Sequence, residues 1–150
     1  MKLIPITKEE YLEYEKNSIQ KYVKELMKAG QVTEEQAKEQ AQATFKRIVP
    51  NGIDTENHYF YYAYENNQKV GFIWYAFREE ESAFIYDFFV LEKMQRKGYG
   101  RKIMLACEEL VRKANKKYMR LHVFGHNTAA RALYDSIGYQ PISIQMRKEL

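Results

Sequence analysis

Apolar residues in the first third of the chain recur at roughly helical spacing and are separated by polar ones. They are Tyr11, Tyr14, Ile19, Tyr22, Val23 and Leu26. Thr7 with Glu10, and Thr33 with Gln36, form Thr-x-x-Glu/Gln capping boxes, which satisfy free amides at a helix start. Three elements are therefore predicted: a short strand at residues 2–6, a helix ending at Gly30, and a second helix stopping before Pro50.

The middle of the chain is rich in strand-forming residues. Two aromatic-dense runs, residues 58–64 and 70–77, flank the turn pair Asn66-Asn67 and predict a hairpin. The run SAFIYDFFV at residues 82–90 is apolar on both faces except at Asp87. This pattern is typical of a central strand that is covered on both sides.

An amphipathic helix is predicted after Gly100. Its apolar positions form one stripe that consists of Ile103, Ala106, Cys107, Leu110, Val111 and Ala114. Three further elements are expected downstream: a strand at 118–124, a short helix at 128–137 stopped by Gly138, and one or two final strands within 139–148.

The predicted elements follow the order β-α-α-β-β-β-α-β-α-β. This order contains both hairpins and a strand–helix–strand crossover, so we expect an α/β (α+β) fold with a central mixed sheet and about four flanking helices. No repeat, linker or low-complexity tract interrupts the 150 residues. Residues 1–150 are therefore expected to form a single domain.

The single cysteine and the lack of long apolar runs limit the class of protein. Cys107 falls on the buried stripe, where a free cysteine usually packs as a small hydrophobe. The N-terminus has no stretch typical of a signal peptide, and no run reaches the ~18 apolar residues of a membrane helix. We expect a cytoplasmic protein with no membrane partner.

Charge is distributed unevenly along the second half of the chain. Residues 79–92 carry five acidic groups and no base, whereas residues 93–120 carry ten basic groups and two acidic ones. A basic region favours an anion: nucleic acid, phospholipid or a polyphosphate cofactor. Basic residues at 112–120 are typical of a solvated helix end, and only Tyr99 and Tyr118 lie in the region for base stacking. Nucleic acid is therefore not the expected partner.

A glycine-containing loop joins the buried strand to the amphipathic helix. Its residues are Gln95, Arg96, Lys97, Gly98, Tyr99 and Gly100. Glycines allow the backbone amides to converge, and the helix start adds partial positive charge, so the segment has the chemistry of an anion site. The alternative is a plain strand-to-helix turn. The chain has no Walker A motif and no dinucleotide fingerprint.

Two blocks of the chain resemble the GNAT superfamily of N-acetyltransferases. The first, Val90–Gly100, is similar to its acetyl-CoA signature, in which a strand ending in Val leads to Q/R-x-x-G-x-G/A. The second is similar to the strand–Asn–helix–Tyr segment and contains Leu121–Asn127, Ala130, Leu133-Tyr134 and Gly138-Tyr139. Glu92 departs from the pattern, because the family often has Pro in this loop. Small bacillus-type members with an AFIYDF strand are the most similar group.

The resemblance implies roles for particular residues. The Val90 N–H would bind the oxyanion, and the Val90 backbone would pair with the pantetheine arm. Asn127 would bind the pantetheine amides, and Tyr134 would be the general acid at the sulfur. The remaining residues implied in acetyl-CoA binding are those of the loop: Gln95, Arg96, Lys97, Gly98, Tyr99, Gly100 and Arg101. No metal is implied.

The general base is not defined by the motif. Asp87 is our candidate, because its apolar setting is expected to raise its carboxyl pKa. On strict alternation, however, Asp87 faces the opposite side of the strand from Val90. Other candidates are Glu79–Glu81, Glu92, His122, His126 and a water chain. His122 and His126 lack the third ligand of a convincing metal set.

The expected function is transfer of an acetyl group from acetyl-CoA to a primary amine, by direct attack in a ternary complex. The acceptor is a small molecule or a peptide. The alternative is a non-catalytic acyl-CoA-binding or sensor module of the same fold. Family members are often dimers, so the resemblance also implies a homodimer.

Overall fold

The computed structural model describes residues 1–150 and contains one five-stranded sheet with four α-helices. The strands, in their order across the sheet, are β1 (Lys2–Pro5), β2 (His58–Glu65), β3 (Gln68–Ala76), β4 (Ser82–Val90) and β5 (Tyr118–Leu121). The helices are α1 (Lys8–Lys28), α2 (Glu34–Ile48), α3 (Tyr99–Lys113) and α4 (Thr128–Ser136), with short 3-10 turns η1 (Gly52–Asp54) and η2 (Glu92–Met94).

The sheet is mixed, as predicted. Strands β1 to β4 are antiparallel neighbours, whereas β4 and β5 are parallel and are joined through α3. The predicted hairpin is present between β2 and β3. Asn66 and Asn67 make its turn with φ angles of 50° and 64°, a left-handed conformation that asparagine tolerates better than most residues.

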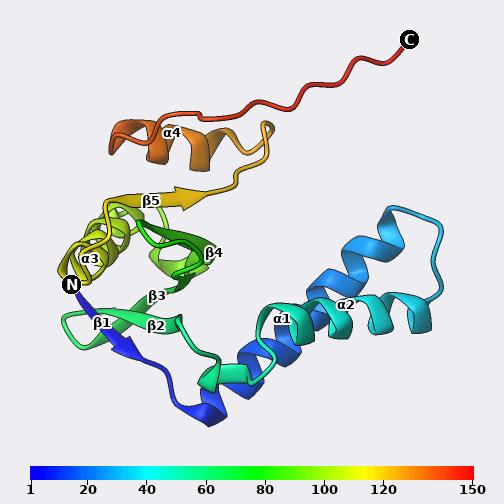
Figure 1. The fold of residues 1–150 in the computed structure, drawn as a ribbon, viewed down its shortest axis with the longest axis horizontal. Helices are drawn as coiled ribbons and strands as arrows, with labels where there is room; N and C mark the ends of the chain where they lie inside the picture. The colour runs from blue at the N-terminus through cyan, green and yellow to red at the C-terminus, as the bar shows by residue number, and fades with distance from the viewer.

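Both predicted capping boxes are confirmed. Thr7 Oγ1 accepts the Glu10 amide at 3.1 Å while the Glu10 carboxylate accepts the Thr7 amide at 2.9 Å. Thr33 and Gln36 form the same reciprocal pair at the start of α2. Helices α1 and α2 pack together as a hairpin that projects from the body of the molecule (Figure 1). None of the helices has a segment with the length and apolarity that crossing a membrane requires.

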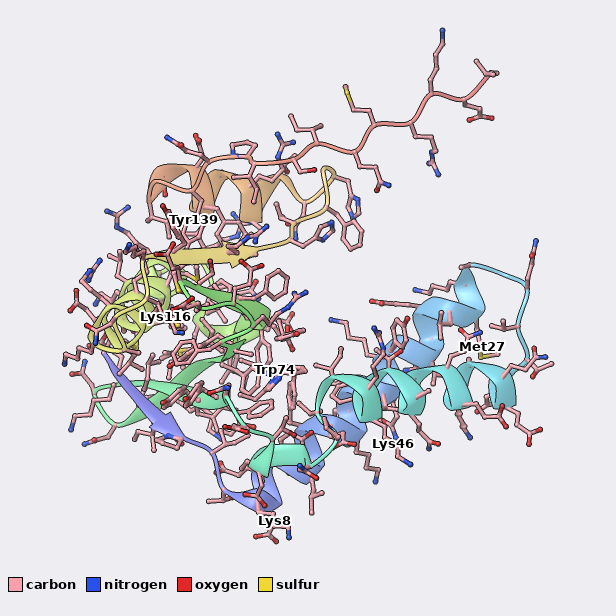
Figure 2. All side chains as sticks on the ribbon, viewed as in Figure 1. Lys8, Met27, Lys46, Trp74, Lys116 and Tyr139 are labelled. Carbon is pink, nitrogen blue, oxygen red and sulfur yellow. The ribbon has the colours of Figure 1, made fainter.

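The two faces of the sheet carry separate cores. On one face, Ile73 and Tyr75 of β3 pack with buried residues of α3, among them Ile103 and Cys107. On the other face, the aromatic core consists of Tyr11, Tyr14, Phe60, Phe72 and Trp74, with Ile6 and Val49. Figure 2 shows Trp74 on the side that faces α1 and α2. The packing role expected of Cys107 is confirmed, since its side chain is fully buried.

The predicted strands at the C-terminus are absent. β5 ends at Leu121 rather than at residue 124, and no strand forms after α4. Residues 140–150 are exposed and form no backbone hydrogen bond within the chain. A strand requires a pairing partner, and this segment has none within its own chain, so the order ends β-α instead of β-α-β.

Candidate active site

The candidate site lies where the pairing between β4 and β5 ends. Ser82–Ile85 pair with Tyr118–Leu121, and β5 ends there. The rest of β4, Tyr86–Val90, has a neighbouring strand only on the β3 side. Backbone donors and acceptors on its other edge are therefore free to pair with an extended ligand, as a further strand would.

The amide of Val90 points toward this open edge. Leu91 donates its N–H to the Val70 carbonyl of β3 at 2.9 Å, and successive residues of a strand direct their polar groups to opposite edges. The Val90 carbonyl, on the open side, accepts Gln95 Nε2 at 3.1 Å. The side chain of Gln95 therefore fastens the loop to the strand end, while the Val90 N–H remains a donor.

The loop that follows β4 turns through two left-handed residues, Arg96 at φ 62° and Gly98 at φ 81°. No atom lies within 4 Å of the position that a Cβ would take at Gly98, so this side of the loop is open. The Lys102 N–H makes a helical bond to the Gly98 carbonyl at 3.3 Å, and no side chain caps α3. The amides before Lys102 form the free N-terminus of a helix, which favours an anion.

Positive charge surrounds these amides. Arg96, Lys97 and Arg101 are exposed and form no ion pair within the chain, so their charges are available to a ligand. Lys102 instead pairs with Glu65 of β2 at 3.3 Å. The expected combination of loop amides and basic side chains is therefore present at one end of β4.

Gly100 allows β4, α3 and α4 to meet at the site. A Cβ at this position would lie 3.3 Å from Leu133 of α4 and 3.6 Å from both Phe88 and Val90 of β4. A larger side chain would push these elements apart. The spacing Gly98-Tyr99-Gly100 thus has two distinct uses: Gly98 turns the backbone and Gly100 permits close packing.

Helix α4 has Asn127 as its N-cap and carries Tyr134 in its last turn. Asn127 is exposed and its Oδ1 caps α4 by accepting the Ala130 amide at 3.3 Å, which leaves its Nδ2 group as a donor. Tyr134 is half-buried, with its ring centroid 5.7 Å from that of Tyr139. Burial raises the pKa of Tyr134, and the negative charge of Asp87 raises it further. Its phenol is therefore held in the protonated, donating form.

Asp87 faces the helical arm, on the opposite side of the sheet from Val90, as alternation predicted. Its Oδ2 accepts the Tyr14 hydroxyl of α1 at 2.6 Å, whereas the Val90 side chain packs in the α3-side core. Burial raises the pKa of Asp87, and the bond from Tyr14 opposes that rise. The direction agrees with the expectation for a carboxyl in an apolar strand.

A β-bulge helps place Asp87. Trp74 of β3 pairs with Asp87 and Tyr75 pairs with Ile85, so Tyr86 is an extra residue in β4. The Tyr86 ring stacks on Trp74 at 4.7 Å, and Asp87 bonds Tyr14, so both neighbours lie on the aromatic face. Bulges of this kind redirect side chains.

Two residues of the site were not singled out from the sequence. Tyr14 was assigned only to the apolar stripe of the first helix, although it orients Asp87. His58 accepts Trp74 Nε1 on its Nδ1 at 3.0 Å and stacks on Tyr86 at 5.5 Å. Burial lowers the pKa of His58, which keeps its imidazole neutral. The sequence gives only a weak indication of either residue. Tyr14 is one of several tyrosines in the apolar stripe of the first helix, and His58 is the first residue of an aromatic strand.

The other side-chain candidates for the base are exposed, unlike Asp87. Glu79 pairs with Arg120 at 2.8 Å and Glu81 with Lys117 at 2.9 Å, before β4 begins, at the opposite end of that strand from Val90. Glu92 is exposed in η2. His122 and His126 are exposed on either side of Phe124, and no cluster of three or more His, Cys, Asp or Glu residues is arranged to hold a metal.

The mixed sheet, the open β4 edge and the glycine loop agree with the GNAT resemblance of the sequence, and the comparison with known families supports it. Residues 19–139 match the model of the acetyltransferase (GNAT) family. The chain belongs to this family.

Similar proteins of Bacillus subtilis (strain 168) extend the match to nearly the whole chain. YdgE, an uncharacterized N-acetyltransferase, is 33% identical over 97% of this chain and 95% of its own length. YycN, another uncharacterized N-acetyltransferase, is 33% identical over 99% of this chain and 97% of its own length. The crystal structure of YycN superposes on this chain with a TM-score of 0.85 and 32% identity, and the match covers 99% of this chain and 98% of the YycN chain. A structure of AAC(6')-Iy in complex with a bisubstrate analogue of CoA and acetylneamine shares the fold, at a TM-score of 0.62 and 13% identity over 99% and 98%.

Proposed function

We propose that this acetyltransferase takes its acetyl group from acetyl-CoA and transfers it by direct attack to a primary amine of a small molecule or peptide. The observation that carries the proposal is the open β4 edge at Val90, placed beside the uncapped start of α3. In acetyl-CoA an extended pantetheine arm, which contains amides, is joined to a pyrophosphate. The arm can pair with the open strand edge and the pyrophosphate can bind the helix start, so the two sites need to lie side by side. The AAC(6')-Iy complex with a CoA-based analogue supports the same use of the fold.

The chain's groups fit acetyl-CoA along its length. Amides of residues 96–101 and the charges of Arg96, Lys97 and Arg101 hold the pyrophosphate, and the positive φ at Gly98 lets the amides converge. The outward groups of β4 near Val90 pair with pantetheine amides, and the free Nδ2 of Asn127 donates to them. Acetyl-CoA supplies an activated acetyl group to this site.

Two acid–base groups and one amide then carry the transfer. Asp87, held by Tyr14, accepts the proton that the attacking amine must lose, directly or through water. The Val90 N–H donates to the carbonyl oxygen, where negative charge develops. A carbon–nitrogen bond forms and the carbon–sulfur bond breaks, and Tyr134 gives its proton to the departing thiolate. The raised pKa of Asp87 and that of Tyr134 suit these opposite roles.

Calorimetric titration of acetyl-CoA tests the proposal. We expect saturable micromolar binding to the wild type and at least about tenfold weaker binding to Gly98→Glu, because the new carboxylate lies against the pyrophosphate. Gly30→Glu is the matched control. Gly30 has φ +80° and Gly98 φ +81°, so both substitutions impose the same backbone strain, but Gly30 lies in the α1–α2 turn. Absence of binding by the wild type, or equal loss in both variants, contradicts the proposal.

A further inference from the structure

The face of β4 that carries Asp87 is only partly covered by the rest of the chain. Tyr86 stacks on Trp74, which Figure 2 shows on the side of the sheet that faces α1 and α2. Phe84 packs in neither core of the sheet, and Phe89 is 37% exposed. The side chains on this face, which form the β4 shelf, are Phe84, Tyr86, Asp87 and Phe89. The shelf offers aromatic surface directly beside the proposed base.

Arg78, in the connection between β3 and β4, lies over one end of the shelf. Its Cζ is 4.4 Å from the ring centroid of Phe84 and 5.7 Å from that of Tyr86. A guanidinium that stacks on an aromatic ring keeps the N–H donors along its edge free, and this edge matches the two oxygens of a carboxylate. Arg78 is therefore held in a suitable orientation for an anionic group of a ligand.

The charge of Arg78 is not neutralised within the chain. Three acidic residues follow it in sequence, but Glu79 pairs with Arg120 at 2.8 Å and Glu81 pairs with Lys117 at 2.9 Å. Arg78 itself is exposed and forms no ion pair. The cation at this end of the shelf is available to a ligand.

Asp87 gives the other end of the shelf the opposite charge, and the Tyr14 hydroxyl holds its carboxylate at 2.6 Å. Phe84 and Asp87 are three positions apart with the Tyr86 bulge between them, so the two ends are separated by about 7–10 Å. Because an extended peptide advances by about 3.3–3.6 Å per residue, two or three residues match this separation and a single α-amino acid does not.

We propose that the acceptor is a peptide of two or three residues, with its N-terminal amine at Asp87 and its C-terminal carboxylate on Arg78. This inference rests on the proposed function and names its substrate class. Apolar side chains of the peptide lie against Tyr86 and Phe84. The amine nitrogen forms the bond to the acetyl carbon and its proton passes to Asp87. The carbon–sulfur bond breaks, and Tyr134 protonates the departing thiolate.

Two neighbours of the shelf bear on this assignment. His58 stacks on Tyr86 at 5.5 Å and accepts Trp74 Nε1 on its Nδ1, so the neutral ring has its donor on Nε2 and adds no charge. Burial raises the pKa of Asp87, and the positive charge of Lys21 on α1 is among the influences that oppose this rise, so Lys21 lies near the amine end. Lys21 is therefore the competing site for a carboxylate.

A pair of tripeptides tests the assignment: Ala-Phe-Ala with a free C-terminus, and the same peptide as its C-terminal amide. Both have the same amine. We expect the wild type to use the free acid with a kcat/KM at least about tenfold higher, because only the acid gives Arg78 a charged partner. Arg78→Gln should remove this difference, and Arg78→Lys should restore part of it, because an ammonium keeps the charge but not the planar fork.

The matched control is Arg112→Gln. Arg112 lies in the last turn of α3, on the other face of the sheet, and its side chain is 64% exposed, so this variant should keep the preference for the free acid. Calorimetry adds a second measurement. With the chain saturated by CoA, Arg78→Gln should weaken binding of the free-acid peptide by at least about tenfold, while the Kd for acetyl-CoA stays within about twofold.

The outcomes separate this inference from the proposed function. Equal use of the two peptides by the wild type, a preference that survives Arg78→Gln, or one that is lost in Lys21→Gln instead, would each overturn the inference and leave the proposed function in place. Turnover of neither peptide by a chain that binds acetyl-CoA would do the same. Failure to bind acetyl-CoA would remove the proposed function and this inference with it.

Discussion

Asp87 and Tyr14 are 73 positions apart in sequence and joined at 2.6 Å, and the pair determines how the site responds to pH. Burial raises the pKa of Asp87 above its ordinary value, so the folded chain holds this proton at pH values where the unfolded chain has lost it. Stability contributed at this position therefore falls as pH rises from the ordinary carboxyl pKa through the raised one.

Replacing Asp87 by Asn should remove that pH dependence. Between the ordinary carboxyl pKa and the raised pKa of Asp87, the wild type should lose unfolding free energy as pH rises, and Asp87→Asn should not. Relative to the wild type, the variant should therefore become more stable with rising pH over this range. Tyr14→Phe should instead destabilise the chain by about 1–3 kcal/mol at neutral pH, because ionised Asp87 loses its donor. Urea unfolding at several pH values measures both. Parallel pH curves for Asp87→Asn and the wild type would contradict a raised pKa.

If the proposed function is right, a change at Tyr134 should affect catalysis and leave cofactor binding intact. Its phenol is kept protonated because burial and the charge of Asp87 raise its pKa, so Tyr134→Phe removes a proton donor without removing a binding surface. We expect kcat to fall by about 10²-fold with an amine found by acceptor screening, while the calorimetric Kd for acetyl-CoA stays within about twofold. Release of free thiol follows the reaction. Unchanged turnover would assign the acid role elsewhere, and weakened binding would make Tyr134 a cofactor contact.

At the scale of elements, Gly71 determines how closely α3 approaches the sheet. A Cβ at Gly71 would lie 2.5 Å from the Phe89 carbonyl and 2.7 Å from Ile103 Cδ1, and Gly71 pairs directly with Val90. Gly71→Ala must therefore move either α3 or the strand end that carries the site. We expect it to lower the unfolding free energy by about 1–3 kcal/mol and to weaken acetyl-CoA binding.

Gly125→Ala is the control, because no atom lies within 4 Å of the position that a Cβ would take at Gly125. It should change neither unfolding in urea nor the calorimetric Kd. If Gly71→Ala matched this control, the close contact between β3, β4 and α3 would not limit stability or binding.

The elements that sequence predicted best are those whose signals are local. Both capping boxes join residues three positions apart, and the loop motif occupies consecutive positions, so each can be recognised from the sequence alone. The crowding at Gly71 and the bulge at Tyr86 depend on how two strands align, which no local pattern records. One or two strands were predicted within residues 139–148, but a sequence segment alone does not indicate whether a partner strand is available to it.

Across the whole molecule, distant segments meet in ways that composition only suggested. The acidic and basic stretches were distinguished in the sequence, and the structure joins part of them at the ion pairs of Glu79 with Arg120 and Glu81 with Lys117. This pairing leaves Arg96, Lys97 and Arg101 as unpaired charge at the other end of β4. The overall charge pattern was therefore predictable, but which acidic and basic side chains would form ion pairs with one another in the fold was not.

Stability should also be unevenly distributed over the molecule, because the cores are separate. Ile103, Met104 and Cys107 of α3 are fully buried beneath the sheet, whereas the outer part of the α1–α2 arm relies on a small cluster of Val23, Ala37 and Ala41. Segments with few buried contacts open without global unfolding. We expect amides of α3 and β3 to exchange slowest in hydrogen–deuterium exchange, the outer arm at residues 24–36 faster, and the start of the arm between them.

Acetyl-CoA should change this pattern only near its site. Added cofactor is expected to slow exchange over residues 86–102, where the free β4 edge and the loop amides gain partners, and to leave the outer arm unchanged. The Gly98→Glu variant supplies the control, because it should exchange like the free wild type whether or not acetyl-CoA is present. Protection that appears first in the arm would place the cofactor against α1 and α2, and uniform slowing would mean that binding stabilises the chain as a single unit rather than through the β4 edge.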